Sequence, residues 1–214
     1  MLCLGVIPTG LPSLLAYLVL SNNHLRGTLP SSLVALTNLG TLELSSNSLN
    51  GTLPDTINSL VNLKYFYVNS NSFRGSLPSS IGDLTGLITL LLSRNCLSRT
   101  IPSSIGLLPS LRDLELESNV FTGSVPDSFC NLYLYVVYIC NNNVNSAGCP
   151  FLSSVPNCIE GDYIDYHIGN LITRTPAPTT DMPSPTPTSI PTSLMPVTAA
   201  PSLSPLGMHT CGLM

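Results

Sequence analysis

The sequence of 214 residues has no tryptophan, only three histidines and few charged side chains. Charged residues make up 8% of the chain, against roughly 25% in an average soluble domain. Seven Lys and Arg residues and eleven Asp and Glu residues give a net charge of −4, so the chain lacks the basic surface that nucleic-acid binding requires. The histidines are scattered, and no GxSxG, HExxH, phosphate-loop or kinase motif occurs. We therefore expect no enzyme, no nucleic-acid partner, no cofactor and no metal.

A repeat with a period of 24 residues dominates the sequence. One position of the repeat is always asparagine: Asn23, Asn47, Asn71, Asn95, Asn119 and Asn143. Proline follows each of them seven positions later, and apolar residues, mostly leucine, come eight, five and three positions before. The last unit departs from this pattern with Tyr135, Tyr138 and Cys140. A fixed period of this length is typical of a solenoid of stacked units.

The repeat unit reads LxxLxLxxNxLxGxLPxxLxxLxx, as in Leu39–Asn62. It resembles the plant-type, extracellular subclass of the leucine-rich repeat family, over residues 11–158. That subclass includes receptor-kinase ectodomains, receptor-like proteins and polygalacturonase-inhibiting proteins. The resemblance implies an α/β repeat solenoid, a right-handed superhelix with a parallel sheet on its concave side.

The chemistry of the unit predicts the same architecture. The alternation in LxLxx predicts a short strand, and successive strands would stack in parallel at about 4.8 Å per coil. The Asn amide can satisfy buried backbone groups in its own coil and in the next one. The Gly-x-x-Pro step disfavours a regular helix, so we expect extended and 3₁₀ segments on the convex side. These residues are expected to close the core from that side: Leu33, Ile57, Ile81, Ile105 and Phe129.

The composition divides the chain into four expected regions. Residues 1–14 are a partial or degenerate repeat, residues 15–146 a solenoid of about six units, residues 147–172 a cysteine-bearing cap, and residues 173–214 a disordered stalk rich in Pro, Thr and Ser. The first twenty residues lack a basic segment and contain prolines, so they form no clear signal peptide. We expect the chain to be a fragment, with any membrane or wall anchor after the stalk missing.

Cysteines cluster where the repeat decays, at Cys130, Cys140, Cys149 and Cys158. The resemblance implies a disulfide-bearing cap, for which the favoured pairs are Cys149–Cys158 and Cys130–Cys140. In the alternative, Cys140 and Cys149 fill core positions as buried thiols, and in either case Cys96 is expected to be unpaired. The cysteines, the stalk and a glycosylation sequon at Asn50 indicate an extracellular or cell-surface location.

The concave face is the expected ligand-binding surface. The register places Tyr65, Tyr67 and Leu91 there as an exposed aromatic and apolar centre, bordered by Arg94. An acidic group of three residues follows on its C-terminal side: Asp113, Glu115 and Glu117. Tyrosine and arginine are typical anchors of interfaces, although tyrosine and threonine also favour strands and the acids could simply be a solvated patch.

These features favour a recognition module that binds a protein, peptide or glycan ligand as part of a secreted or cell-surface receptor-like protein. Two alternatives remain open at this point. One is a structural wall or surface protein with a Pro-rich stalk. The other is a fragment of a receptor kinase without its catalytic domain.

Overall fold

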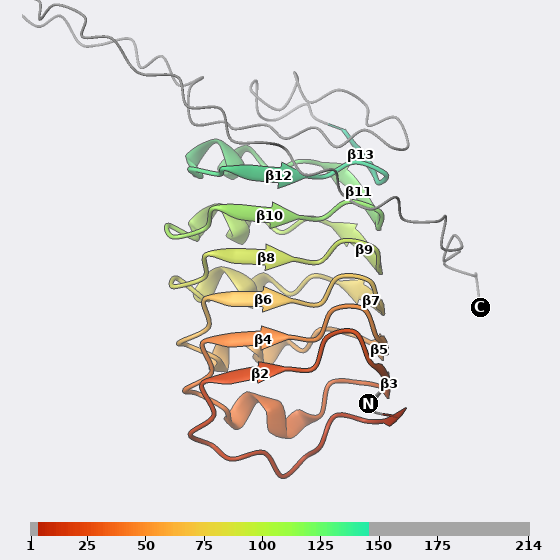
Figure 1. Ribbon diagram of the computed structural model, residues 1–214. Coiled ribbons are helices and arrows are strands. Elements are labelled where there is room, and N and C mark those ends of the chain that lie inside the picture. Colours follow the sequence, from red (N-terminus) through yellow and green to blue (C-terminus); the bar gives the residue numbers. More distant parts are fainter. Residues whose placement is uncertain (1–3, 146–214) are drawn as a thin grey trace, which may run out of the picture. The chain divides into compact units, whose positions relative to one another are not determined.

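The computed structural model describes residues 4–145, which form a stack of coils in chain order (Figure 1). A complete coil contains a three-residue strand, a second short strand and a five-residue 3₁₀ helix, in that order. The expected repeat solenoid, with 3₁₀ turns on the side away from the predicted concave sheet, is confirmed. The predicted cap, the stalk, Cys149 and Cys158 lie outside the described residues.

The first strand of every coil belongs to one parallel sheet of six strands. These strands are β2 (Tyr17–Val19), β4 (Thr41–Glu43), β6 (Tyr65–Tyr67), β8 (Thr89–Leu91), β10 (Asp113–Glu115) and β12 (Val136–Tyr138). The middle residue of each strand is buried, and its neighbours point to the opposite face, as the two-residue period of a strand requires. Residues at the same repeat position therefore lie side by side on the outer face.

A second parallel sheet of seven strands runs along an adjoining side of the stack (Figure 1). Its strands are β1 (Leu4–Gly5), β3 (His24–Gly27), β5 (Ser48–Gly51), β7 (Ser72–Ser76), β9 (Cys96–Thr100), β11 (Val120–Ser124) and β13 (Asn143–Asn145). The sequence predicted these segments as extended but not as a sheet. They pair because each coil follows the same path, so the backbone N–H and C=O groups of one coil meet partners in the next.

Short 3₁₀ helices close each coil on the remaining side. They are η1 (Ser31–Ala35), η2 (Asp55–Ser59), η3 (Ser79–Asp83), η4 (Ser103–Leu107) and η5 (Asp127–Asn131). A proline precedes each of them with φ between −73° and −62°. This fixed φ starts a tight turn, while the restriction that proline places on its predecessor keeps the incoming chain extended.

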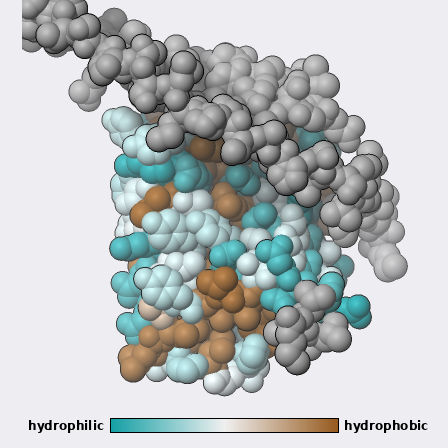
Figure 2. Space-filling model, viewed as in Figure 1, coloured by the Kyte–Doolittle hydropathy of each residue, from teal (hydrophilic) through white to brown (hydrophobic). Residues whose placement is uncertain are grey.

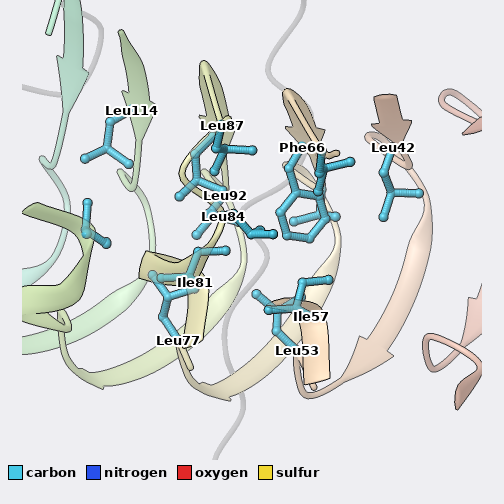
Figure 3. Packing of buried hydrophobic residues seen from close by; sticks show 14 of the residues in the cluster. Leu42, Leu53, Ile57, Phe66, Leu77, Ile81, Leu84, Leu87, Leu92 and Leu114 are labelled. Atoms are coloured by element: carbon cyan, nitrogen blue, oxygen red, sulfur yellow. The ribbon is translucent and has the colours of Figure 1, made fainter. Parts of the chain in front are cut away.

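Leucine and its apolar substitutes fill the space between the two sheets and the turns. Along the six-stranded sheet, Leu42 on β4, Phe66 on β6 and Leu114 on β10 project inward, and Ile57 and Ile81 lie across the core on the turns (Figure 3). All five predicted turn residues that close the core are buried. Each such side chain contributes about 1.5–3 kcal/mol when it leaves water, so the repeated column is the main source of stability.

The repeat asparagines connect the coils by hydrogen bonds, as predicted. Asn71 Nδ2 donates to the backbone oxygen of Val68 at 3.1 Å in its own coil and to that of Leu44 at 2.9 Å in the preceding coil. Its Oδ1 accepts a hydrogen bond from the backbone N–H of Leu49 at 3.0 Å. One side chain thereby satisfies three backbone groups, a function that apolar residues cannot perform. Asn71, Asn95 and Asn119 are buried, whereas Asn23 and Asn47 are half-buried.

The last coil corrects the predicted register. Asn142, and not Asn143, accepts the N–H of Phe121 at 3.0 Å and donates to the backbone oxygen of Leu116 at 2.9 Å. The loop between η5 and β12 is one residue shorter than its counterparts, so the interval from Asn119 is 23 residues rather than 24. The core positions of this coil are consequently Leu134, Val137 and Ile139, all of which are buried.

Candidate functional site on the six-stranded sheet

The outer face of the six-stranded sheet carries two continuous rows of side chains. Pairing between β6, β8 and β10 aligns Tyr65 with Thr89 and Asp113 in one row. The same pairing aligns Tyr67 with Leu91 and Glu115 in the other row. The sheet thus brings six residues together from three coils, and five of the seven predicted ligand-binding residues are among them.

The two tyrosines form the aromatic part of this surface. Their ring centroids lie 6.3 Å apart, with the planes tilted by 45°. Burial raises the pKa of Tyr67 above its ordinary value, and the nearby Thr89 side chain opposes this rise. Tyr65, Tyr67 and Leu91 are half-buried. The centre is therefore less exposed than the sequence predicted, because neighbouring coils cover part of each side chain.

The acidic group is more enclosed than a solvated patch would be. Thr89 Oγ1 donates to Asp113 at 3.1 Å, and Ser93 Oγ donates to Glu115 at 3.1 Å. Burial raises the pKa of Glu117 to about 7, and the negative charge of Glu115 adds to this rise. One carboxylate oxygen of Glu117, Oε2, is buried and has no hydrogen-bond partner among the described residues. Burial also raises the pKa of Glu115.

Two arginines near this surface have different surroundings. Arg94 is exposed and lies in the turn after β8, with a φ of 53°, and its backbone N–H donates to the Glu117 carbonyl at 2.9 Å. Its positive charge opposes the rise in the pKa of both Glu115 and Glu117. Arg112 donates to the backbone oxygen of Leu111, and its guanidinium carbon lies 5.9 Å from the ring centre of Tyr135. Arg94 alone of these two belongs to the site.

The most exposed apolar side chains of this sheet belong to its first strand, β2. Tyr17 is 72% exposed and Val19 is 56% exposed. Figure 2 shows hydrophobic side chains gathered at this end of the face. The sequence placed both residues in the outward columns, but it gave no measure of how much of each side chain neighbouring coils would cover.

The shortened last loop also changes which residues of β12 point outward. The 24-residue register placed Val137 and Ile139 on the outer face, but both are buried. Val136 pairs with Asp113, and Tyr138 pairs with Glu115, so these two extend the rows. A shift of one residue moves every side chain of a strand to the other face. The signal was present in the sequence, since Leu132 and Leu134 are two positions apart whereas Leu108 and Leu111 are three apart.

The described cysteines follow the predicted states only in part. Cys96, expected to be unpaired, is disulfide-bonded, and so is Cys130. Cys140 is a half-buried thiol, so the predicted Cys130–Cys140 pair is wrong. Cys140 follows β12, the strand whose register is shifted by one residue. Asn50, the sequon residue, is exposed on β5.

Among residues 4–145, no three His, Cys, Asp or Glu side chains converge in a way that could hold a metal ion. Within the same range, no helix has the length and apolar character needed to cross a membrane.

Comparison with protein families gives matches to two related models. A model described as Leucine rich repeat matches residues 13–73, and a second with the same description matches residues 86–108 and 110–132. No curated protein matches the chain. Several solved structures do.

Three of these structures share 31% sequence identity with the chain over 65% of its length. The plant peptide hormone receptor RGFR1 in complex with RGF2 gives a TM-score of 0.64. The Arabidopsis receptor kinase HAESA, in complex with the peptide hormone IDA and the co-receptor SERK1, gives 0.63. A plant ice-binding protein gives 0.62. The matched part covers 23%, 24% and 46% of these chains, respectively, so the chain corresponds to only part of each.

Proposed function

This chain belongs to the leucine-rich repeat family, and from that membership we propose that it is a non-enzymatic recognition module for a protein or peptide ligand. Peptide-hormone receptors are among its structural neighbours. The proposed site is the outer face of the six-stranded sheet, with Tyr65, Tyr67 and Leu91 at its centre.

One observation carries this proposal, namely the two adjoining rows in which tyrosines, a leucine and carboxylates lie side by side. Tyr67 is already half-buried and lies against the Tyr65 ring, so it would lose little conformational freedom on binding. Leu91 keeps part of its apolar surface in water, where it contributes little to folding. A partner that covers both gains apolar area at a small entropic cost.

The carboxylates of this face indicate that the proposed ligand carries a positive charge. Glu117 Oε2 is buried and lacks a donor among the described residues, and Glu115 lies two positions before it on the same face. An ammonium or guanidinium group of the ligand would supply the missing donor and compensate the charge. We therefore propose a peptide or protein segment with a basic side chain that lies beside Glu115 and Glu117. Asp113 and Arg94 would border it.

This arrangement implies a pH dependence of binding. The Glu117 carboxyl has a pKa of about 7 in the chain without a ligand, and a bound cation would lower that pKa. Complex formation would then release a proton at pH values below 7. Affinity should increase as the pH rises towards 7 and change little above it, because there the carboxylate is already charged.

The proposed location is extracellular or at the cell surface, as part of a receptor-like protein. The exposed sequon residue Asn50 lies on the seven-stranded sheet, so a glycan there would leave the outer face of the six-stranded sheet accessible. Crosslinking of the chain to wall material would instead favour the structural wall protein. A full-length transcript with a transmembrane segment and kinase motifs would identify a receptor-kinase fragment.

The proposal can be tested by capture from extracellular fluid with three baits. They are the wild-type chain, Tyr67→Ala and Tyr133→Ala, the last of which removes an exposed tyrosine outside both sheets. Loss of an aromatic anchor costs about 2 kcal/mol, or roughly 30-fold in affinity. A ligand retained by wild type and Tyr133→Ala but depleted with Tyr67→Ala supports the proposal. Equal capture by all three baits would place the site elsewhere.

A further inference from the structure

A shallow groove of about 480 Å³ lies on the side of the coils that carries the 3₁₀ turns. It is bounded by the ends of β9 and β11 and by the starts of η3 and η4. Five of its side chains carry hydroxyl groups: Ser79, Thr100, Ser103, Ser104 and Ser124. Ile101, Pro102 and Pro126 supply the apolar surface. The groove is separate from the proposed ligand face, since it includes no residue of the six-stranded sheet.

Among residues 4–145, no charged side chain lines this groove. The repeat shows why an uncharged groove forms between these two coils. The position eight residues after each ladder asparagine holds, in order, Ser31, Asp55, Ser79, Ser103 and Asp127. Ser79 and Ser103 therefore form a pair of uncharged residues in consecutive coils. The coil before this pair carries Asp55 at the same position, and the coil after it carries Asp127. An anionic ligand would meet Asp55 at one end and Asp127 at the other.

The walls of the groove are held rigidly. Ser104 Oγ donates to the backbone oxygen of Ser79 at 2.6 Å, and Ser128 Oγ donates to that of Ser103 at 2.7 Å, so consecutive turns are tied together. Pro102 and Pro126 have φ values of −70° and −62°, which their rings fix. A preformed surface of this kind pays little ordering entropy when a ligand binds.

Three of the hydroxyls remain available to a ligand. The side chains of Thr100, Ser103 and Ser124 are exposed and have no hydrogen bond to another described residue. Each hydroxyl can donate one hydrogen bond and accept two. The groove therefore combines donors and acceptors in the same groups with two flat, apolar proline rings.

We propose that this groove binds one or two rings of a neutral sugar. Sugar hydroxyls donate and accept in the same way as the hydroxyls of Thr100, Ser103 and Ser124, and the C–H face of a sugar ring can pack on Pro102 and Pro126. The volume lies within the range of about 300–1,000 Å³ that small-ligand sites occupy. The flanking aspartates select against sugars that carry carboxylates.

The test is a titration of the full chain with cellotetraose, xylotetraose, mannotetraose and tetragalacturonic acid, followed by NMR of the backbone amides. At least one neutral tetrasaccharide is expected to bind with a Kd of about 0.1–1 mM and to shift the signals of residues 100–104 and 124. Tetragalacturonic acid is expected to bind more weakly. The proposal is overturned if no neutral sugar shifts these signals at about 10 mM.

Two pairs of variants show whether binding occurs in the groove. Ser103→Phe fills it, whereas Ser31→Phe places the same side chain at the equivalent exposed position of the first turn. Ser103→Phe should weaken sugar binding at least about tenfold, with no change for Ser31→Phe. Thr100→Val removes one hydroxyl at nearly constant side-chain volume and should lower the affinity for the sugar about three- to tenfold. Thr28→Val, at the equivalent position of the first turn, should leave that affinity unchanged. Unchanged affinity in both groove variants would overturn the proposal.

Discussion

Arg99 occupies a position at which four other coils carry glycine, and Ser76 is the residue of the preceding coil that leaves room for it. The backbone of Arg99 has a φ of 67°, close to the 81–82° of the equivalent glycines. In three other pairs of coils, a threonine occupies the position equivalent to Ser76, and its methyl group leaves no room for a Cβ on the facing glycine. A Cβ on that glycine would lie only 2.6–3.0 Å from the methyl carbon in the pairs Thr28 with Gly51, Thr52 with Gly75 and Thr100 with Gly123. Ser76 has no methyl group, and the pairing of Ser76 with Ser98 places it next to Arg99.

Ser76→Thr is therefore expected to be destabilising, although serine and threonine differ by one methyl group. That methyl would meet the Cβ of Arg99, and overpacking of this kind costs about 1–3 kcal/mol. Thermal unfolding of the single variants and of the double variant with Arg99→Gly measures the coupling.

Arg99→Gly should largely rescue Ser76→Thr, because it restores the threonine–glycine pair found elsewhere. Ser72→Thr, at an exposed position of the same strand, is the matched control and should be nearly neutral. Strictly additive effects of Ser76→Thr and Arg99→Gly would show that the two side chains do not meet.

The last coil gives a second prediction, which concerns adjacent asparagines. Asn142→Ala should destabilise the chain by about 1–3 kcal/mol, because the Phe121 N–H and two backbone carbonyls would lose their partner. Asn143→Ala should have a much smaller effect, as Asn143 is the first residue of β13. Denaturant unfolding compares the two variants. A larger loss of stability with Asn143→Ala than with Asn142→Ala would show that the 24-residue register suggested by the sequence is correct.

Much of the fold could be predicted from the sequence, because the same pattern of apolar residues recurs in several coils. A column that is leucine in coil after coil can only be a core column, and Leu42, Phe66 and Leu114 confirm this. The prediction failed where the repeat changed its length, since a constant period was applied to the last unit. The short spacing of Leu132 and Leu134 was the available signal, but the interval of 24 residues from Asn119 to Asn143, equal to all earlier intervals, favoured the wrong register.

For the candidate site, the sequence was enough to predict which residues of neighbouring strands lie side by side, but not how deeply they are buried. The period of the repeat was enough to place Tyr67, Leu91 and Glu115 in one row, and their pairing confirms that row. The degree of burial could not be derived, because it depends on how closely neighbouring side chains approach. The raised pKa of Glu117 is a product of that enclosure, and nothing in the spacing of the three acids distinguished it from a solvated residue.

Glu117 gives a third prediction, on the pH dependence of stability. Its pKa of about 7 in the folded chain lies above the ordinary value of 4.5, so between these values the folded state holds more proton than the unfolded state. The stabilisation from the protonated form is present in full below pH 4.5 and is lost as the pH rises through 7. Glu117→Gln keeps an uncharged side chain at every pH.

Melting temperatures at pH 5 and pH 8 measure this difference. Glu117→Gln and wild type should be similar at pH 5, whereas at pH 8 the variant should be more stable by an amount of the order of 1–3 kcal/mol. Asp55→Asn, on an exposed turn, should shift the melting temperature equally at both pH values. If the advantage of Glu117→Gln does not grow with pH, the carboxyl is not enclosed as described.

Binding at the six-stranded sheet is tested most directly by hydroxyl-radical footprinting of the full chain, with and without the peptide or protein captured by the wild-type bait. Mass spectrometry then reads the oxidation rate of individual side chains, and Tyr133, outside both sheets, serves as an internal control. We predict that the ligand slows oxidation of Tyr65, Tyr67 and Leu91 at least about threefold and leaves Tyr133 unchanged. Unchanged oxidation of Tyr65 and Tyr67 in a saturated complex would contradict recognition at this face.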